Sequence, residues 1–113
     1  MDARLTAFLE AFKVKLGIWG IVYRDDRGKN AQTLLDLDIS TKERRKILEN
    51  LLVEDFIEGP LTDKLNNGAD MWVFGKNIKG KEVYIKITLG SANSTVICIS
   101  FHIAERPLNF PKK

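Results

Sequence analysis

Apolar residues near the start of the chain recur every three or four positions, which is the spacing of one face of an α-helix. The residues of this stripe are Leu5, Phe8, Leu9, Phe12 and Leu16. Gly17 follows the stripe directly and is predicted to end the helix. Residues 18–23 are rich in β-branched and aromatic side chains and predict a short strand.

Two shorter helices are predicted after this strand. The first covers Ala31–Leu37, with Asn30 as its N-cap. The second begins at Ser40, because Ser40 and Glu43 have the spacing of a capping box, in which each side chain binds the backbone N–H of the other residue. It is predicted to end near residue 53.

Strand-like segments dominate the rest of the chain. A short strand is predicted at Glu54–Glu58, and Gly59-Pro60 is expected to break it. Three further strands are predicted at residues 71–75, 83–89 and 96–103, separated by turns that contain glycine. Helices followed by neighbouring strands predict an α+β fold, with N-terminal helices packed on one face of a mainly antiparallel sheet. We expect residues 1–113 to form a single domain.

Alternation within the last two strands places polar side chains on the face away from the core. If Val83 and Ile85 point inward, Tyr84 and Lys86 point outward. In the last strand, Ile97, Ile99, Phe101 and Ile103 are predicted to point inward and Cys98, Ser100 and His102 outward. Antiparallel pairing of the two strands would bring the two polar sets together. The position of Cys98 between two isoleucines nevertheless favours a packing role.

Composition excludes several classes of protein. The longest apolar runs are too short to cross a membrane, and charged residues interrupt the N-terminal segment, so we expect neither a signal peptide nor a membrane anchor. The expected compartment is therefore the cytoplasm. With one cysteine and one histidine, the 113 residues contain no internal disulfide, Cys-rich site or multi-histidine zinc site. We expect no metal and no cofactor.

Charge is distributed unevenly along the chain. The net charge is +3, but residues 1–71 carry 11 basic and 13 acidic side chains, whereas residues 72–113 carry 7 basic and 2 acidic ones. A basic half of this kind is typical of a surface that binds phosphates. The alternative is that the lysines keep an exposed sheet and tail in solution.

The outward side chains suit RNA cleavage by the 2′-hydroxyl group. This reaction needs a base, an acid and cations that stabilise the charged phosphorus intermediate. Histidine serves as acid or base near neutral pH, lysine stabilises negative charge, and tyrosine hydrogen-bonds a phosphate or stacks on a base. These roles would fall to His102, Lys86 and Tyr84. The alternative is that all three are ordinary side chains of an exposed sheet face.

The order of these features resembles that of the MqsR family of bacterial toxins. The resemblance extends from Leu5 to Glu105 and depends on the order and spacing of several short motifs. After the first helix and strand come Thr33-Leu34-Leu35, the acidic-aromatic step Glu54-Asp55-Phe56, Trp72 at the start of a hairpin, Val83-Tyr84-Ile85-Lys86-Ile87 and Ile99-Ser100-Phe101.

This resemblance implies a RelE-like fold and an endoribonuclease that cleaves mRNA without the ribosome. It also implies the toxin role of a type II toxin–antitoxin system, with a cognate antitoxin protein as partner. The family tyrosine thought to act at the scissile phosphate falls on Tyr84. The chain departs from the family at three positions, since Glu58 and His102 replace lysines and Val73 replaces a glutamine. We expect the charge of Glu58 to repel phosphate.

Two hypotheses follow for the function. In the first, the chain is a metal-independent mRNA endoribonuclease with Tyr84, Lys86 and His102 as catalytic residues. Its single-stranded mRNA would be held by five basic residues, namely Arg24, Lys76, Lys79, Lys81 and Arg106. In the second, the chain is a catalytically inactive relative that binds protein or RNA through the same sheet. A structural α+β domain without either activity is a third alternative.

Overall fold

The computed structural model describes residues 2–25, 28–64 and 68–113. The helices in this part of the chain are α1 (Ala3–Trp19), α2 (Lys29–Leu37), α3 (Thr41–Glu49) and the 3₁₀ helix η1 (Val53–Asp55). The strands are β1 (Ile21–Tyr23), β2 (Phe56–Leu61), β3 (Met71–Ile78), β4 (Lys81–Thr88) and β5 (Val96–Ile103). The predicted α+β fold is therefore confirmed.

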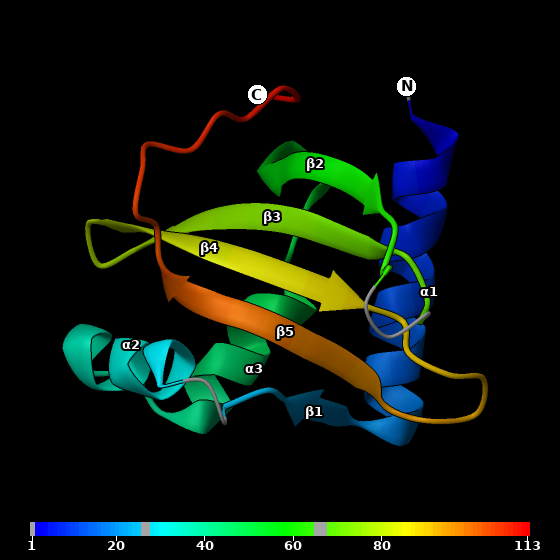
Figure 1. Ribbon diagram of the computed structural model, residues 1–113, viewed down its shortest axis with the longest axis horizontal. Helices are drawn as coiled ribbons and strands as arrows, with labels where there is room; N and C mark the ends of the chain where they lie inside the picture. The colour runs from blue at the N-terminus through cyan, green and yellow to red at the C-terminus, as the bar shows by residue number, and fades with distance from the viewer. Residues whose placement is uncertain (1, 26–27, 65–67) are drawn as a thin grey trace.

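The strands form one five-stranded sheet in the order β1-β5-β4-β3-β2. β1 is parallel to β5, and the other neighbouring pairs are antiparallel. Helices α1 and α3 lie behind one face of this sheet in Figure 1, and α2 lies beside β5. We call the opposite face the open face. The C-terminal tail, residues 104–113, leaves β5 and passes the ends of β4 and β3 (Figure 1).

Helix α1 buries the stripe predicted from the sequence, namely Leu5, Phe8, Leu9, Phe12 and Leu16. The ring of Phe8 stacks on Trp72 of β3 at a centroid distance of 4.9 Å. The predicted end at Gly17 was wrong. The helix continues to Trp19 and ends at Gly20, whose φ of 85° lies in the region that favours glycine. The strand predicted at residues 18–23 is consequently reduced to Ile21–Tyr23.

The predicted capping box of α3 is confirmed. The hydroxyl of Ser40 accepts a hydrogen bond from the backbone N–H of Glu43 at 3.0 Å, and the Glu43 carboxylate accepts one from the N–H of Ser40 at 3.1 Å. The helix ends at Glu49 rather than near residue 53. The prediction that Asn30 caps α2 was wrong, because α2 begins at Lys29 and the side chain of Asn30 is buried against β5.

Two irregularities in strand pairing decide which side chains reach the open face. Lys86 of β4 opposes Ser100, but its neighbour Ile87 opposes Cys98, so Ile99 is an extra residue in β5. The predicted alternation of residues 96–103 was therefore wrong before Ile99. Val96 and Cys98 point into the core, whereas Ser100 and His102 oppose the open-face side chains of β4.

Strand β2 contains a similar irregularity, and Gly59-Pro60 lies within the strand instead of breaking it. Phe56 opposes Phe74, which is part of the core, but Glu58 opposes Val73, the next residue along β3. Opposed residues of paired strands point to the same side of a sheet. Glu58 therefore points to the open face, although Phe56 points to the core.

In the described residues, no helix is long and apolar enough to cross a membrane.

Candidate functional site

Tyr84 and His102 lie directly opposite each other on β4 and β5. Their rings stack with centroids 5.2 Å apart and planes 19° from parallel. Lys86 opposes Ser100 on the next outward row, and its Nζ lies 6.0 Å from the centre of the Tyr84 ring. The structure thus brings together the three catalytic candidates predicted from the sequence, Tyr84, Lys86 and His102.

These side chains line a hollow of about 560 Å³ on the open face. Its strand residues are Glu58, Tyr84, Lys86, Ser100 and His102, and the tail contributes residues 104–108. The hollow therefore has a floor made by the sheet and a wall made by the C-terminal tail. The tail turns an otherwise flat sheet surface into a concave site, which is the usual shape of a ligand-binding site.

The tail is held against the sheet by specific contacts. The backbone N–H of Leu108 donates a hydrogen bond to the Glu82 carboxylate at 3.1 Å. Gly75 of β3 leaves room for the tail, since a Cβ atom there would lie 2.6 Å from Leu108 Cδ1 and 2.9 Å from the Phe110 ring. Both distances are shorter than van der Waals contact. The missing side chain at Gly75 therefore allows the tail to approach.

The phenol of Tyr84 is held in its neutral form. Burial raises its pKa above the ordinary value, and the negative charge of Glu58 raises it further. Tyr84 is therefore a hydrogen-bond donor near neutral pH. The Nδ1 atom of His102 lies 3.1 Å from the carbonyl oxygen of Ile103. Because a carbonyl oxygen only accepts, a neutral His102 ring in this contact carries its hydrogen on Nδ1 and leaves Nε2 as the acceptor.

The basic residues predicted to bind RNA do not all gather at this hollow. Arg106 lines it. Lys81 lines an adjoining depression of about 280 Å³ together with Arg106, but by register it opposes the core residue Ile78. Lys76 opposes the core residue Val83 and forms an ion pair with the buried Asp55 at 2.9 Å, so it lies on the helix side of the sheet.

Two of these basic residues lie elsewhere on the molecule. The Nζ of Lys79 donates a hydrogen bond to the carbonyl oxygen of Asp38 at 2.8 Å, next to α2. Arg24 follows β1, where its backbone N–H binds the carbonyl oxygen of Cys98. Neither residue is part of the hollow's lining. Arg106 is therefore the candidate that lines the site, and Lys81 borders only the adjoining depression.

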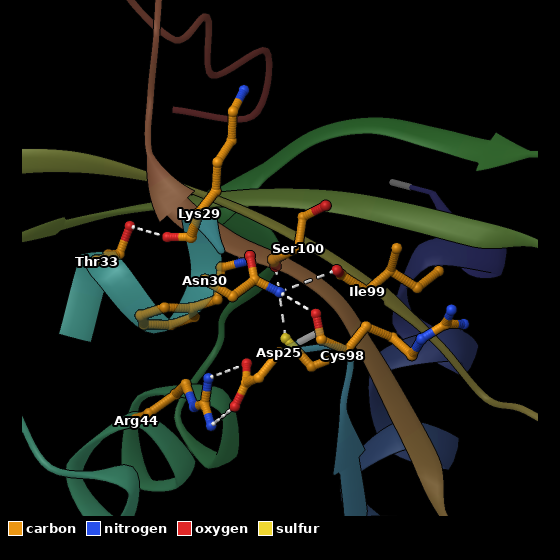
Figure 2. A network of polar contacts seen from close by, with 10 residues as sticks. Asp25, Lys29, Asn30, Thr33, Arg44, Cys98, Ile99 and Ser100 are labelled. Carbon is orange, nitrogen blue, oxygen red and sulfur yellow. Dashed lines mark hydrogen bonds and ion pairs between the residues drawn. The ribbon is translucent and has the colours of Figure 1, made fainter. Parts of the chain in front are cut away.

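Helix α2 holds the part of β5 that carries Ser100 and His102. The Asn30 side chain donates to the carbonyl oxygens of Ile99 at 3.2 Å and Arg24 at 3.0 Å, and accepts from the Phe101 N–H at 3.0 Å. Figure 2 shows Asn30 between the helix and the strand. These bonds satisfy backbone groups around the extra residue Ile99, which β1 does not reach because its pairing ends at Cys98.

Thr33 continues this attachment one turn further along α2. Its hydroxyl donates to the carbonyl oxygen of Lys29 at 2.9 Å and accepts from the N–H of Ile103 at 3.3 Å. The donors at Phe101 and Ile103 lie on either side of His102. Two side chains of one helix therefore fix the backbone on both sides of the candidate catalytic histidine.

A buried arginine lies beneath this region. Arg44 of α3 is 1% exposed and forms two hydrogen bonds with the Asp25 carboxylate at 2.9 and 3.0 Å (Figure 2). Its guanidinium carbon also lies 3.5 Å from the centre of the Tyr23 ring. Burial raises the pKa of the nearby Cys98 thiol to about 12. This thiol stays protonated near neutral pH, which supports its predicted packing role.

Two components of the hollow were not predicted from the sequence. Glu58 was expected only as a departure from a family motif, and of the tail wall only Arg106 was predicted, as an RNA-binding residue. Neither has a sequence signal, because each depends on an irregular register or on contacts between distant segments.

Within the described ranges, no group of three or more His, Cys, Asp and Glu side chains is placed to hold a metal ion.

No protein-family model matches this chain, and no significant match occurs among curated proteins or solved structures. The MqsR resemblance therefore stays a prediction from the order of short motifs. The function has to be inferred from the geometry of the hollow.

Proposed function

We propose that this chain cleaves single-stranded RNA and acts as the toxin of a type II toxin–antitoxin system. The observation that supports this proposal most directly is the stacked Tyr84–His102 pair, with Lys86 beside it, in a hollow of the open face. A proton-transfer group, a neutral donor and a cation are the components that RNA cleavage through the 2′-hydroxyl requires.

In this reaction the 2′-oxygen attacks the adjacent phosphorus and the 5′-oxygen leaves. His102 exchanges a proton with one of the reacting oxygens. Tyr84 donates a hydrogen bond to a nonbridging phosphate oxygen, which its neutral phenol favours. Lys86 stabilises the negative charge that accumulates on the phosphorus intermediate. The products are a 2′,3′-cyclic phosphate and a 5′-hydroxyl end.

The hollow is lined by two cations, Lys86 and Arg106, and by two carboxylates, Glu58 and Glu105, of which Glu105 is paired with Lys29. Arg106 on the tail can bind a flanking phosphate, and Lys81 lines the depression next to the hollow. An unpaired strand is the expected substrate, because in-line attack by the 2′-oxygen requires a rotation of the backbone that a duplex resists. The toxin role adds a cognate antitoxin protein as a partner.

The test compares cleavage of a single-stranded RNA with that of the same RNA carrying 2′-deoxy sugars, both with a metal chelator. Wild type is expected to cleave the RNA, to leave a 2′,3′-cyclic phosphate and to spare the deoxy analogue. Tyr84→Phe and His102→Ala should each slow cleavage about 100-fold or more. Lys42→Ala, which removes an exposed lysine of α3, is the matched control. The proposal fails if wild type cleaves no faster than the Tyr84→Phe, His102→Ala double variant.

A second candidate function is a binding module without catalysis. It is favoured by Glu58, since a carboxylate in the hollow repels phosphate unless it takes part in the reaction. Growth on expression of the chain separates the candidates. Arrest that His102→Ala relieves supports the nuclease, whereas RNA binding without cleavage or arrest supports the binding module.

A further inference from the structure

Glu58 reaches the hollow because of an irregularity in β2. Phe56 opposes Phe74 and points to the core, and in a regular strand Glu58 would point the same way. The extra residue Ile57 places Glu58 opposite Val73 instead, on the open face. Bulges of this kind redirect single side chains and are frequent beside active sites. The fold thus directs a carboxylate into the candidate site.

The strand residues that line the hollow follow one another across the sheet, from β2 at one side to β5 at the other. Register connects Glu58 of β2 with Val73 of β3, Val73 with Lys86 of β4, and Lys86 with Ser100 of β5. His102 lies two residues from Ser100 on the same strand and face. The carboxylate and the imidazole therefore enter the hollow from strands on opposite sides, and Lys86 lies between these strands.

This order matches the requirements of in-line phosphoryl transfer. The attacking 2′-oxygen and the leaving 5′-oxygen lie on opposite sides of the phosphorus, so the base and the acid must also lie on opposite sides. A cation between them faces the nonbridging oxygens. Carboxylate and histidine side chains are both established proton-transfer groups in enzymes.

We propose that Glu58 is the general base of this site and His102 its general acid, an assignment that rests on the proposed ribonuclease function. Glu58 takes the proton of the 2′-hydroxyl as the bond from the 2′-oxygen to phosphorus forms. His102 begins this step protonated on both ring nitrogens and gives its Nε2 proton to the 5′-oxygen as the bond from that oxygen to phosphorus breaks. Protonated Glu58 and neutral His102 then return to their starting states by exchanging protons with water.

Replacement of Glu58 by glutamine tests this role, because a general base and a carboxylate that only repels phosphate predict opposite changes in the cleavage rate. Glu58→Gln keeps the size of the side chain and removes both its charge and its basicity. Loss of a general base slows kcat about 100-fold or more. If Glu58 only repels phosphate, the same variant binds RNA more tightly and cleaves at least as fast as wild type, which overturns the proposal.

Glu54→Gln is the matched control, because it removes the same charge from an exposed residue of η1 outside the lining of the hollow. It should leave kcat unchanged. Thermal unfolding and the affinity for the 2′-deoxy analogue check that Glu58→Gln is folded and still binds. Since Glu58 is exposed, its replacement leaves the core intact.

An RNA with sulfur in place of the 5′-bridging oxygen assigns the two roles. Its thiolate leaves without a proton, so the general acid becomes dispensable. Cleavage of this RNA by His102→Ala should approach the wild-type rate, whereas Glu58→Gln should remain slow. Rescue of Glu58→Gln instead of His102→Ala would reverse the assignment and overturn the proposal. Absence of RNA cleavage by wild type refutes the proposed function itself, whereas fast cleavage by both wild type and Glu58→Gln refutes this inference alone.

Discussion

The ring of Tyr84 lies against the ring of His102, with the centroids 5.2 Å apart and the planes 19° from parallel. The two residues oppose each other across β4 and β5, so the sheet register fixes the contact. Each ring limits the rotation of the other. A phenol and an imidazole are thereby held in one place, as a catalytic site requires.

The ionisation of Tyr84 should respond to Glu58. Burial is the larger cause of its raised pKa, and the charge of Glu58 is the second. Glu58→Gln should therefore lower the pKa of Tyr84 while leaving it above the ordinary value of about 10. An ultraviolet pH titration measures this pKa, and Tyr84→Phe separates its signal from that of Tyr23. An unchanged pKa in Glu58→Gln would contradict the position of the carboxylate.

Stability should fall at alkaline pH. A tyrosine with a raised pKa in the folded state keeps its proton where the unfolded chain has already lost it, so its stabilising contribution is complete below about pH 10 and is lost as pH rises through the folded pKa. Both Tyr23 and Tyr84 have raised pKa values. Urea unfolding above pH 9 should show this decline. It should be shallower in Tyr84→Phe, and an equal slope in the two proteins would argue against the raised pKa.

Replacement of Asn30 should destabilise the fold and disturb the site together. Asn30→Ala leaves the Phe101 N–H and the Ile99 and Arg24 carbonyl oxygens without their amide partner, at a cost of roughly 1–3 kcal/mol. Urea unfolding measures the loss, and the NMR shifts of the His102 ring report the site. Gln32→Ala on the exposed side of α2 should cost less than about 0.5 kcal/mol. Equal effects of the two variants would show that Asn30 does not anchor β5.

Removal of the charge of Asp25 should be more costly than breaking an exposed ion pair. The Arg44 side chain is 1% exposed and its Asp25 partner 37%, so Asp25→Asn leaves a buried guanidinium without its counterion. The expected loss is about 1–3 kcal/mol, since Asp25 is partly solvated. Glu49→Gln, which breaks the exposed pair with Arg45, should change the free energy of unfolding by less than about 0.5 kcal/mol. Denaturant unfolding of both variants decides the comparison.

A methyl group at Gly75 should displace the tail. The Cβ of Gly75→Ala would lie 2.6 Å from Leu108 Cδ1, and the flexible end of that side chain moves more easily than the sheet does. Hydrogen exchange at the Leu108 N–H should accelerate as its bond to Glu82 is lost. Gly17→Ala, with no atom within 4 Å of the new Cβ, should stabilise α1 by up to about 1 kcal/mol and leave Leu108 protected. Unchanged protection in Gly75→Ala would show that the tail does not rest on this glycine.

Several features that depend on neighbouring residues were predictable from the sequence, although the end of α1 was wrongly predicted at Gly17. Three such features follow from spacing along the chain: the apolar stripe of α1, the Ser40–Glu43 capping box, and the placement of Tyr84 and His102 on the same face of the sheet. Their periodicity is imposed by backbone geometry, which is the same in every helix and strand.

Features that depend on contacts between distant segments were not predictable. The side chain of Asn30 forms bonds to β5 rather than capping its own helix, and the extra residues Ile57 and Ile99 follow from the fit between whole strands. The tail wall similarly depends on a glycine of β3. The side chains that β4 and β5 contribute to the hollow were therefore predictable from the alternation of these strands. The position of Glu58 and, apart from Arg106, the contribution of the tail were not.

The extra residue Ile99 divides β5 into two segments of opposite phase. Before it, even-numbered residues point into the core, as Val96 and Cys98 do; after it, even-numbered residues point outward, as Ser100 and His102 do. Deleting Ile99 would join Cys98 directly to Ser100 and restore a regular alternation, with Cys98 still in the core and His102 still on the open face. An alignment of this chain with a protein that lacks the extra residue would therefore need a gap at Ile99, and without that gap it would assign one half of the strand to the wrong face.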